Sequence, residues 1–244
     1  MTYQSFVTAL LCLLIGVTSV TRAVSAEPGK MLSHYRLIVE YRFIGEQPPD
    51  GEDWAWRNSG VMLHSQDPMT MPPGQDFPIS VEVQFLGGRG DGSSRPTANM
   101  CSPGTHIVYQ GEFNDTHCIT SMSQTFDGDQ WVTVEVLVEG DERIVHYVNG
   151  EQVMEYSGTT TGGGVVSGHR PEMKPEGKPL ASGYISLQSE SHPIQFRRVA
   201  LLNLEDATGG VFLPKDGQAD PANIAHALAK GARQKGVQIF EQTK

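Results

Sequence analysis

A strict two-residue alternation of apolar and polar side chains runs through the centre of this chain and limits what it can fold into. Residues 35–43, 79–85 and 132–138 each place an apolar side chain at every second position. Successive side chains on a β-strand point to opposite faces of the sheet, so each segment predicts a strand with one buried and one solvated face. No stretch between residues 35 and 204 shows a convincing helical period. The pattern therefore predicts antiparallel sheets in an all-β domain.

A tight turn joins two of the predicted strands. Residues 143–148 run into Asn149-Gly150, and residues 152–156 resume the strand pattern. Asn-Gly between two apolar-rich runs is the strongest short hairpin signal, because both residues tolerate the positive φ angles of the turn. Residues 183–188 and 194–204 predict two more strands. Residues 87–105 and 157–182 are rich in Gly, Pro and small polar residues, and we interpret them as long loops.

The first 26 residues differ in character from the rest. Residues 7–20 form an apolar run that is too short for a comfortable membrane span, and Val24-Ser25-Ala26 offers the small residues that a signal peptidase reads. We interpret residues 1–26 as a cleaved signal peptide, although no Lys or Arg precedes residue 22. A buried helix is the alternative. The signal peptide predicts export to the periplasm or the extracellular space, with no membrane contact after cleavage.

Charge and cysteine content narrow the partners and the compartment. The formal net charge is -10, and a chain this acidic is not expected to bind nucleic acid, because phosphate contacts need clustered Lys and Arg. Cys101 and Cys118 are the cysteines that remain after signal cleavage. An even pair in an exported protein indicates one disulfide, and two free buried thiols are the alternative.

The strand around residue 82 carries the most informative polar pair. Residues two apart on a strand project to the same side, so Glu82 and Gln84 share one face, opposite Val81, Val83 and Phe85. If the apolar set faces the core, Glu82 and Gln84 line the open face of the sheet. A carboxylate beside an amide can bind sugar hydroxyls or act as a general base. A solvated outer face without a function is the alternative.

Aromatic side chains and one polar turn add to this set. Trp54, Trp56 and Trp131 could stack on sugar rings or belong to the core. The turn Arg57-Asn58-Ser59-Gly60 leads into a predicted strand, and it also has a plain structural reading as a strand entry.

A second cluster lies at the predicted hairpin of residues 187–197. It brings together a carboxylate, an imidazole and a guanidinium, in Glu190, His192 and Arg197. His192 is a candidate general acid or base, and a loop histidine with no role is the alternative. The chain has no zinc spacing of Cys and His, no P-loop, no Gly-x-Ser-x-Gly elbow and no dinucleotide fingerprint. No motif therefore predicts a metal or a cofactor.

Taken in chain order, these segments resemble the 3-keto-disaccharide hydrolase domain family. The resemblance covers about residues 32–205 and is carried by Tyr35–Phe43, Asn58-Ser59-Gly60-Val61, Val81-Glu82-Val83-Gln84, Asp129-Gln130-Trp131, Val148-Asn149-Gly150, and Gly183–Gln188 with Phe196-Arg197. It implies a concanavalin-like jelly-roll, an antiparallel sandwich of two sheets. It also implies a secreted enzyme that cleaves glycosides carrying a ketone at C3, with an oxidised di- or oligosaccharide as its partner.

The resemblance implies a chemistry and assigns residues to it. A C3 ketone acidifies the C2 proton, so a base can remove that proton, the glycosidic oxygen leaves, and water then adds back. Glu82 is expected as the base or as a substrate ligand, and Glu190 and His192 are candidates for the other catalytic roles. The expected substrate-binding residues are Arg57, Asn58, Gln84, Trp131, Gln188 and Arg197, with a structural ion pair as the alternative for Arg197. No cofactor is predicted, and a divalent metal remains open.

The two ends of the chain depart from the family pattern. Further strands precede Tyr35 in the family, so the domain of residues 27–205 is expected to be N-terminally shortened. In residues 206–244, Asp220-Pro221 predicts a helix start, and residues 237–240 predict a short strand. This appendage resembles a fragment of flavin-dependent dimethylglycine/sarcosine dehydrogenases. The nucleotide-binding glycines are absent, so flavin binding is not expected.

Three functions are consistent with this sequence. The first is a secreted hydrolase or lyase that acts on 3-keto-glycosides. The second is a carbohydrate-binding module without catalysis, since jelly-rolls of this kind often only bind. The third is an inactive truncated product.

Overall fold

The computed structural model describes residues 30–205, and this part of the chain consists almost entirely of strands and loops. Three short 3-10 helices interrupt the loops, η1 (Asp53–Ala55), η2 (Pro68–Thr70) and η3 (Pro171–Met173). The strands are β1 (His34–Phe43), β2 (Asn58–Ser65), β3 (Val81–Leu86), β4 (Asn99–Cys101), β5 (Thr105–Tyr109), β6 (Glu112–Asn114), β7 (Cys118–Ile119), β8 (Val132–Glu139), β9 (Arg143–Val148), β10 (Glu151–Thr161), β11 (Tyr184–Ser189) and β12 (Ile194–Asn203).

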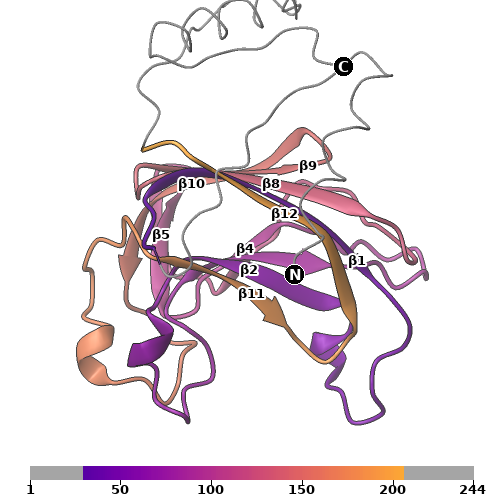
Figure 1. Cartoon of the computed structure of the whole chain (residues 1–244), viewed down its shortest axis with the longest axis horizontal. Helices are drawn as coiled ribbons and strands as arrows, with labels where there is room; N and C mark the ends of the chain where they lie inside the picture. The colour runs from indigo at the N-terminus through magenta and orange to yellow at the C-terminus, as the bar shows by residue number, and fades with distance from the viewer. Residues whose placement is uncertain (1–29, 206–244) are drawn as a thin grey trace, which may run out of the picture. The chain divides into compact units, whose positions relative to one another are not determined.

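These strands form two antiparallel sheets that face each other (Figure 1). The seven-stranded sheet has the order β12-β1-β8-β9-β10-β5-β6, and the five-stranded sheet has the order β11-β2-β3-β4-β7. The chain crosses repeatedly between the sheets, because β1 and β2, or β11 and β12, belong to different ones. The predicted antiparallel two-sheet jelly-roll is confirmed.

The alternation seen in the sequence places the core between the two sheets. In β1, Leu37 and Val39 are buried and lie opposite Val136 and Val134 of β8. β8 alternates buried and half-buried residues along its whole length. The apolar face of each strand is therefore the face that packs against the other sheet, as a period of two requires.

The predicted hairpin at Asn149-Gly150 is confirmed. Asn149 has a φ of 50° and Gly150 a φ of 90°, the left-handed values that a two-residue turn between antiparallel strands needs. The side-chain oxygen of Asn149 also accepts a hydrogen bond from the backbone N–H of Thr133, at 3.0 Å. This contact fixes the turn against the neighbouring strand β8.

Both predicted loops contain strand residues. β4 lies within residues 87–105, and it is too short to show a period of two in the sequence. β10 continues to Thr161, into the second predicted loop, because its residues from Ser157 onward pair with β5, with a register shift between Ser157 and Thr160. Gly158, with a φ of 59°, lies at this irregularity. The two predicted loops are therefore shorter than their Gly and Pro content suggested.

The predicted signal peptide and C-terminal appendage lie outside the described residues. β1, the first long strand of the described part, is paired on both sides, with β12 and with β8. None of the helices in residues 30–205 is long and apolar enough to cross a bilayer.

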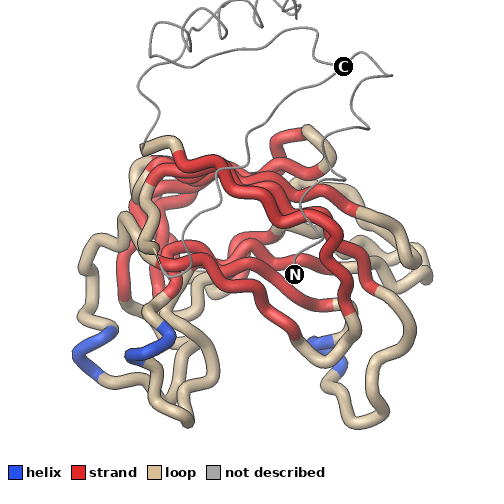
Figure 2. The backbone as a smooth tube through the Cα atoms, viewed as in Figure 1, coloured by secondary structure: helices blue, strands red, loops and turns tan. Residues whose placement is uncertain are grey.

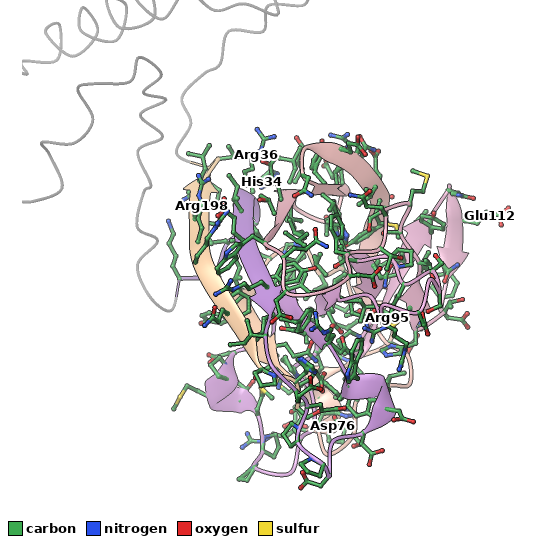
Figure 3. All side chains as sticks on the ribbon, turned by 90° about the vertical axis from the view of Figure 1, so that its right-hand side faces the viewer. His34, Arg36, Asp76, Arg95, Glu112 and Arg198 are labelled. Carbon is green, nitrogen blue, oxygen red and sulfur yellow. A yellow bond between two sulfur atoms is a disulfide. The ribbon has the colours of Figure 1, made fainter. Side chains whose placement is uncertain are left out.

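Long loops project from one side of the molecule. The segments that carry η1, η2 and η3 all hang on the outer side of the five-stranded sheet (Figures 1 and 2). Arg36 and Arg198, on β1 and β12, lie at the opposite end of the view from Asp76, which belongs to one of these loops (Figure 3). The outer face of the five-stranded sheet is therefore the face that the loops surround.

Candidate functional site

The site is built on β3, the central strand of the five-stranded sheet. Val81, Val83 and Phe85 are fully buried in the core, so Glu82 and Gln84 project from the outer face. The prediction that these two side chains share the face away from the core is therefore confirmed.

Strand register places a row of polar residues across this face. Gln188 of β11 lies opposite Gly60 of β2, Gly60 lies opposite Gln84 of β3, and Gln84 lies opposite Asn99 of β4. Glu82, two residues before Gln84, lies opposite Cys101 on β4. Three side-chain amides and one carboxyl from β11, β3 and β4 thus come together across Gly60 of β2.

Gly60 leaves the space in which this group meets. A Cβ atom at this position would lie 2.7 Å from Oε1 of Glu82 and 3.0 Å from Oε1 of Gln188. Both distances are shorter than ordinary van der Waals contact, so any side chain at position 60 would displace one of the two groups. Position 60 therefore requires a glycine to leave room for these two side chains, and not to adopt a left-handed backbone conformation.

Glu82 sits in an environment that disfavours its charge. Its side chain is 6% exposed, and no hydrogen bond to its carboxyl group is found among the described residues. Burial, with a smaller contribution from the nearby charge of Glu190, raises the pKa of Glu82 to about 8. Burial also raises the pKa of Glu190, which is half-buried and accepts a hydrogen bond from Nε2 of Gln188. The site therefore holds two interacting carboxyl groups, and Glu82, with a pKa of about 8, remains largely protonated near neutral pH.

The amides around these carboxyls are only partly satisfied. Nδ2 of Asn99 donates to Oε1 of Gln84 at 3.1 Å, and Nδ2 of Asn58 donates to the backbone oxygen of Trp54 at 3.2 Å. Oδ1 of Asn58 and Oε1 of Gln188 are buried and accept no hydrogen bond in the described structure. Buried acceptors without partners are uncommon, and a ligand hydroxyl group would satisfy them.

These groups line a pocket of about 90 Å³. Its polar lining consists of Asn58, Glu82, Gln84, His117, Gln188 and Glu190, and its apolar lining consists of Trp54, Phe77, Pro103 and the Cys101–Cys118 disulfide. Trp54 is 57% exposed, an unusual position for a large aromatic side chain. A polar floor with an exposed aromatic ring at the rim is suited to a ligand with hydroxyl groups and an apolar face.

Arg57 and His192 lie outside the lining of this pocket. Arg57 donates to Asp129 Oδ1 at 2.7 Å and to the backbone oxygen of Gly128 at 2.6 Å, so its guanidinium is held by the loop before β8. His192 is 1% exposed and packs edge-on against the rings of Phe43 and Trp56, at 5.8 and 5.6 Å between centroids. Burial, followed by the charge of Arg57, lowers the pKa of His192.

Trp131 and Arg197 lie on the outer face of the other sheet. The ring of Trp131 is flanked by the guanidinium groups of Arg42 and Arg197, at 4.7 and 4.6 Å from the ring centroid. Arg197 also forms an ion pair with Glu40 at 2.6 Å, which agrees with the structural alternative for this residue. The physical reason is the alternation itself, because Val132 points into the core and Trp131 therefore points out of the seven-stranded sheet.

Of the residues expected from the sequence, the pocket thus brings together Glu82, Glu190, Asn58, Gln84 and Gln188. Sequence reasoning missed Gly60, Asn99, Phe77 and His117 as parts of the site. Gly60 belongs to the segment Asn58-Ser59-Gly60-Val61, which contributes to the family resemblance. A glycine inside a strand is itself a signal that another group approaches the backbone closely. Asn99 lies in the predicted loop of residues 87–105, whereas Phe77 and His117 lie outside the predicted strands and loops, and none of the three gave such a signal.

The predicted disulfide between Cys101 and Cys118 is present, and it joins β4 to β7 in the wall of the pocket. Within residues 30–205, no group of three or more His, Cys, Asp or Glu side chains is arranged to hold a metal ion.

Comparison with known protein families agrees with this arrangement. The family model described as the 3-keto-alpha-glucoside-1,2-lyase-like domain matches residues 27–202. The chain belongs to this family. The match includes every residue that lines the Glu82 pocket. A second family model, described as FAD dependent oxidoreductase, matches residues 188–244, in line with the flavoenzyme-like fragment expected at the C-terminus.

Similarity to individual proteins is more limited. The mouse (Mus musculus) protein "Pyruvate dehydrogenase phosphatase regulatory subunit, mitochondrial" is 40% identical over 55 residues, which are 22% of this chain. The chain spans only 6% of the length of that relative. Among solved structures, the carbohydrate-binding module CBM66 from Bacillus subtilis has a TM-score of 0.38 at 10% identity, over 71% of this chain and 77% of that chain. A tetrameric galectin from the sponge Cinachyrella sp. has a TM-score of 0.32 at 16% identity, over 69% and 92%.

Proposed function

We propose that this protein is an exported enzyme that cleaves 3-keto-glycosides at the Glu82 pocket. The observation that carries the proposal is a buried carboxyl group, Glu82, whose pKa is raised to about 8 and which faces a second carboxyl across a pocket with unsatisfied amide oxygens. Perturbed carboxyl pairs in a pocket are typical of acid–base sites. The family to which the domain belongs supports the choice of substrate class.

In the proposed reaction, the ionised carboxylate of Glu82 removes the proton from C2 of the sugar. The electron pair of that C–H bond forms the C1–C2 double bond through the enolate of the C3 ketone. The C1–O bond to the leaving group breaks, and the leaving oxygen takes a proton from Glu190. Addition of water across the double bond then gives net hydrolysis. No oxidant or reductant is consumed, so the reaction requires no flavin.

The pKa of Glu82 suits the role of a base. A carboxylate with a pKa near the working pH is a stronger base than an ordinary one and still has a substantial ionised fraction. The catalytic rate is therefore expected to rise with pH through about 8, the pKa of Glu82. If Glu82 served as the acid, the rate would fall over the same range.

The neighbouring amides are assigned to substrate binding. The unsatisfied oxygens of Asn58 and Gln188 are proposed to accept hydrogen bonds from sugar hydroxyls, and the amide nitrogen of Gln84 to donate to the enolate oxygen. Arg57 and His192 are proposed to support the rim of the site through their contacts with Asp129 and Trp56. The disulfide supports export, because disulfides persist in oxidising compartments.

A binding function without turnover is the second candidate. The observation in its favour is Trp54, whose exposed ring at the rim of the pocket could hold a sugar by stacking alone. Such a module would bind glycans and release no product. In that case Glu82→Gln would retain most of the affinity.

The test is to incubate the purified protein with a 3-keto-disaccharide in D2O and to follow the products by NMR. Elimination followed by addition of solvent places deuterium at C2 of the released keto sugar, whereas direct hydrolysis leaves the proton there. Glu82→Gln is expected to abolish turnover while keeping a cooperative melt, and Glu112→Gln, an exposed glutamate on β6 (Figure 3), serves as the matched control. Turnover without deuterium at C2, or full turnover by Glu82→Gln, would refute the proposal. Absence of a cooperative melt in the wild-type protein would favour an inactive product.

A further inference from the structure

A second, larger pocket adjoins the Glu82 pocket on the same face of the sheet. Its volume is about 320 Å³, compared with about 90 Å³ for the Glu82 pocket. Phe77, Gln188 and Glu190 line both pockets and form the border between them. The remaining lining of the larger pocket includes Met62 on β2 and Ser186 on β11, which lie opposite each other in the sheet.

We infer that this second pocket binds the leaving-group sugar, the unoxidised half of a 3-keto-disaccharide. The inference rests on the proposed function, and it names the part of the substrate that the Glu82 pocket leaves unaccounted for. The keto sugar would occupy the smaller pocket, with the scissile bond at the border.

The position of Glu190 supports this division. Glu190 belongs to both pockets, and it is close enough to Glu82 for the two charges to interact. The group that protonates the leaving oxygen has to stand where the two sugars join, because that oxygen is the bridge between them. Gln188 holds Glu190 there through the hydrogen bond from its side-chain amide.

The lining of the second pocket is also suited to a sugar. Phe77 offers an aromatic ring at the border, and Met62 and Pro78 add apolar surface for the C–H face of a pyranose. Ser186 and Gln188 supply polar groups along one side. Apolar walls with a few placed polar groups are the usual composition of a small-ligand site.

The wall of the second pocket is held in place before a ligand arrives. The carboxylate of Asp76, beside Phe77, accepts hydrogen bonds from the backbone N–H and the hydroxyl of Ser167, at 2.9 and 2.7 Å. These bonds lower the pKa of Asp76 and tie the loop that carries Phe77 to the long loop before β11. A fixed wall is consistent with a specific site for one half of the substrate.

Ser186 offers a direct test. Its hydroxyl donates to Ser65 Oγ at 2.8 Å, so Ser186→Ala removes this bond without filling the pocket, whereas Ser186→Phe places a ring in it. With a 3-keto-disaccharide as substrate, Ser186→Phe is expected to raise KM about tenfold or more, because the new ring occupies the space of the leaving-group sugar and removes its contacts with the pocket. With methyl 3-keto-glucoside, whose leaving group is methanol, both variants should remain within about twofold of the wild type.

A second measurement on the wild-type protein avoids any effect of folding. Free leaving-group sugar should inhibit cleavage of the disaccharide competitively, because both need the second pocket. It should have little effect on cleavage of methyl 3-keto-glucoside, which does not need that pocket. Equal effects of Ser186→Phe on both substrates, or no inhibition by the free sugar, would overturn the second-pocket assignment and leave the proposed function intact. If the wild-type protein cleaves neither substrate, the proposed function and this assignment both fail.

Discussion

Replacement of Glu82 by Gln is expected to abolish turnover and, at neutral and alkaline pH, to stabilise the protein. The change keeps the shape of the side chain and removes its titration. In the folded protein, burial raises the pKa of Glu82 to about 8, while an unfolded chain has the ordinary value of 4.5. Between these values, the unfolded chain releases a proton that the folded protein retains. Folding therefore becomes less favourable as pH rises from 4.5 to 8.

The size of this effect follows from the two pKa values. One unit of difference corresponds to about 1.4 kcal/mol, so Glu82 should lower the stability of the wild-type protein by about 3 kcal/mol at pH 7 and by about 5 kcal/mol above pH 9. At pH 5, the loss should be about 1 kcal/mol or less. The difference in unfolding free energy between Glu82→Gln and wild type should therefore be small at pH 5 and grow with pH.

The assay is equilibrium unfolding in urea at pH 5, 7 and 9, on the full chain without reductant, so that the disulfide stays intact. Subtraction of the wild-type curve removes every other titrating group that the two proteins share. Glu112→Gln is the matched control, because this residue is exposed on the short strand β6 and lies outside the site. A difference that is constant with pH, or a less stable Glu82→Gln at pH 9, would refute the account of a buried, charge-disfavouring site.

Other substitutions test the walls of the site and the core behind it. Gly60→Ala should fold, because the atoms nearest its Cβ are the ends of flexible side chains. It should lower kcat/KM by at least about tenfold, because the new methyl group displaces Glu82. Unchanged kinetics would show that Gly60 is not needed to make room for Glu82. Trp54→Ala should leave the urea midpoint unchanged, since the ring is 57% exposed, and weaken glycan binding about tenfold in calorimetry, a result that equal affinity would contradict. Burial lowers the pKa of His146 from 6.5 to about 4. As pH falls from 6.5 to 4, the unfolded chain therefore binds a proton that the folded protein does not, and the free energy of unfolding should fall by about 3 kcal/mol. Measured in the Glu82→Gln background, His146→Gln should flatten that fall, and an unchanged slope would assign it to other groups.

The strands that the sequence predicted are those whose alternation is long enough to be read. β1 and β8 alternate over eight or more residues, and their apolar sides are buried as expected. β4 and β7 have three and two residues, too few for a period to appear, yet they carry the disulfide and Asn99. Their pairing is set by the tertiary fold and could not be derived from local pattern.

The composition of the site was predictable only in part, for a related reason. Alternation indicates that Glu82 and Trp131 both point away from the core, but it does not say to which sheet each strand belongs. β3 lies in the five-stranded sheet and β8 in the seven-stranded sheet, so the two side chains project from opposite sides of the sandwich. His192 differs again, because its loop folds back onto Phe43 and Trp56 and buries a ring that the sequence could equally well have exposed. Sheet membership and loop packing are long-range properties, which a period of two does not encode.

Several local features of the five-stranded sheet are unfavourable for folding, and all of them meet at one point. Gly60 occupies the interior of a strand, where glycine lowers stability by about 0.5–1 kcal/mol relative to alanine. Beside it, Glu82 is buried without a hydrogen bond among the described residues, and the oxygens of Asn58 and Gln188 accept none. The cost of the unpaired carboxyl and amide oxygens would be reduced by a bound molecule that offers hydroxyl groups and a transferable proton, and the glycine leaves the space in which these groups meet. A solvated outer face without a ligand gives no reason for these features to coincide, because local preferences that oppose folding are expected where a function requires them. Their coincidence at Gly60 is therefore the strongest argument that this face of the sandwich is a site for a polar ligand.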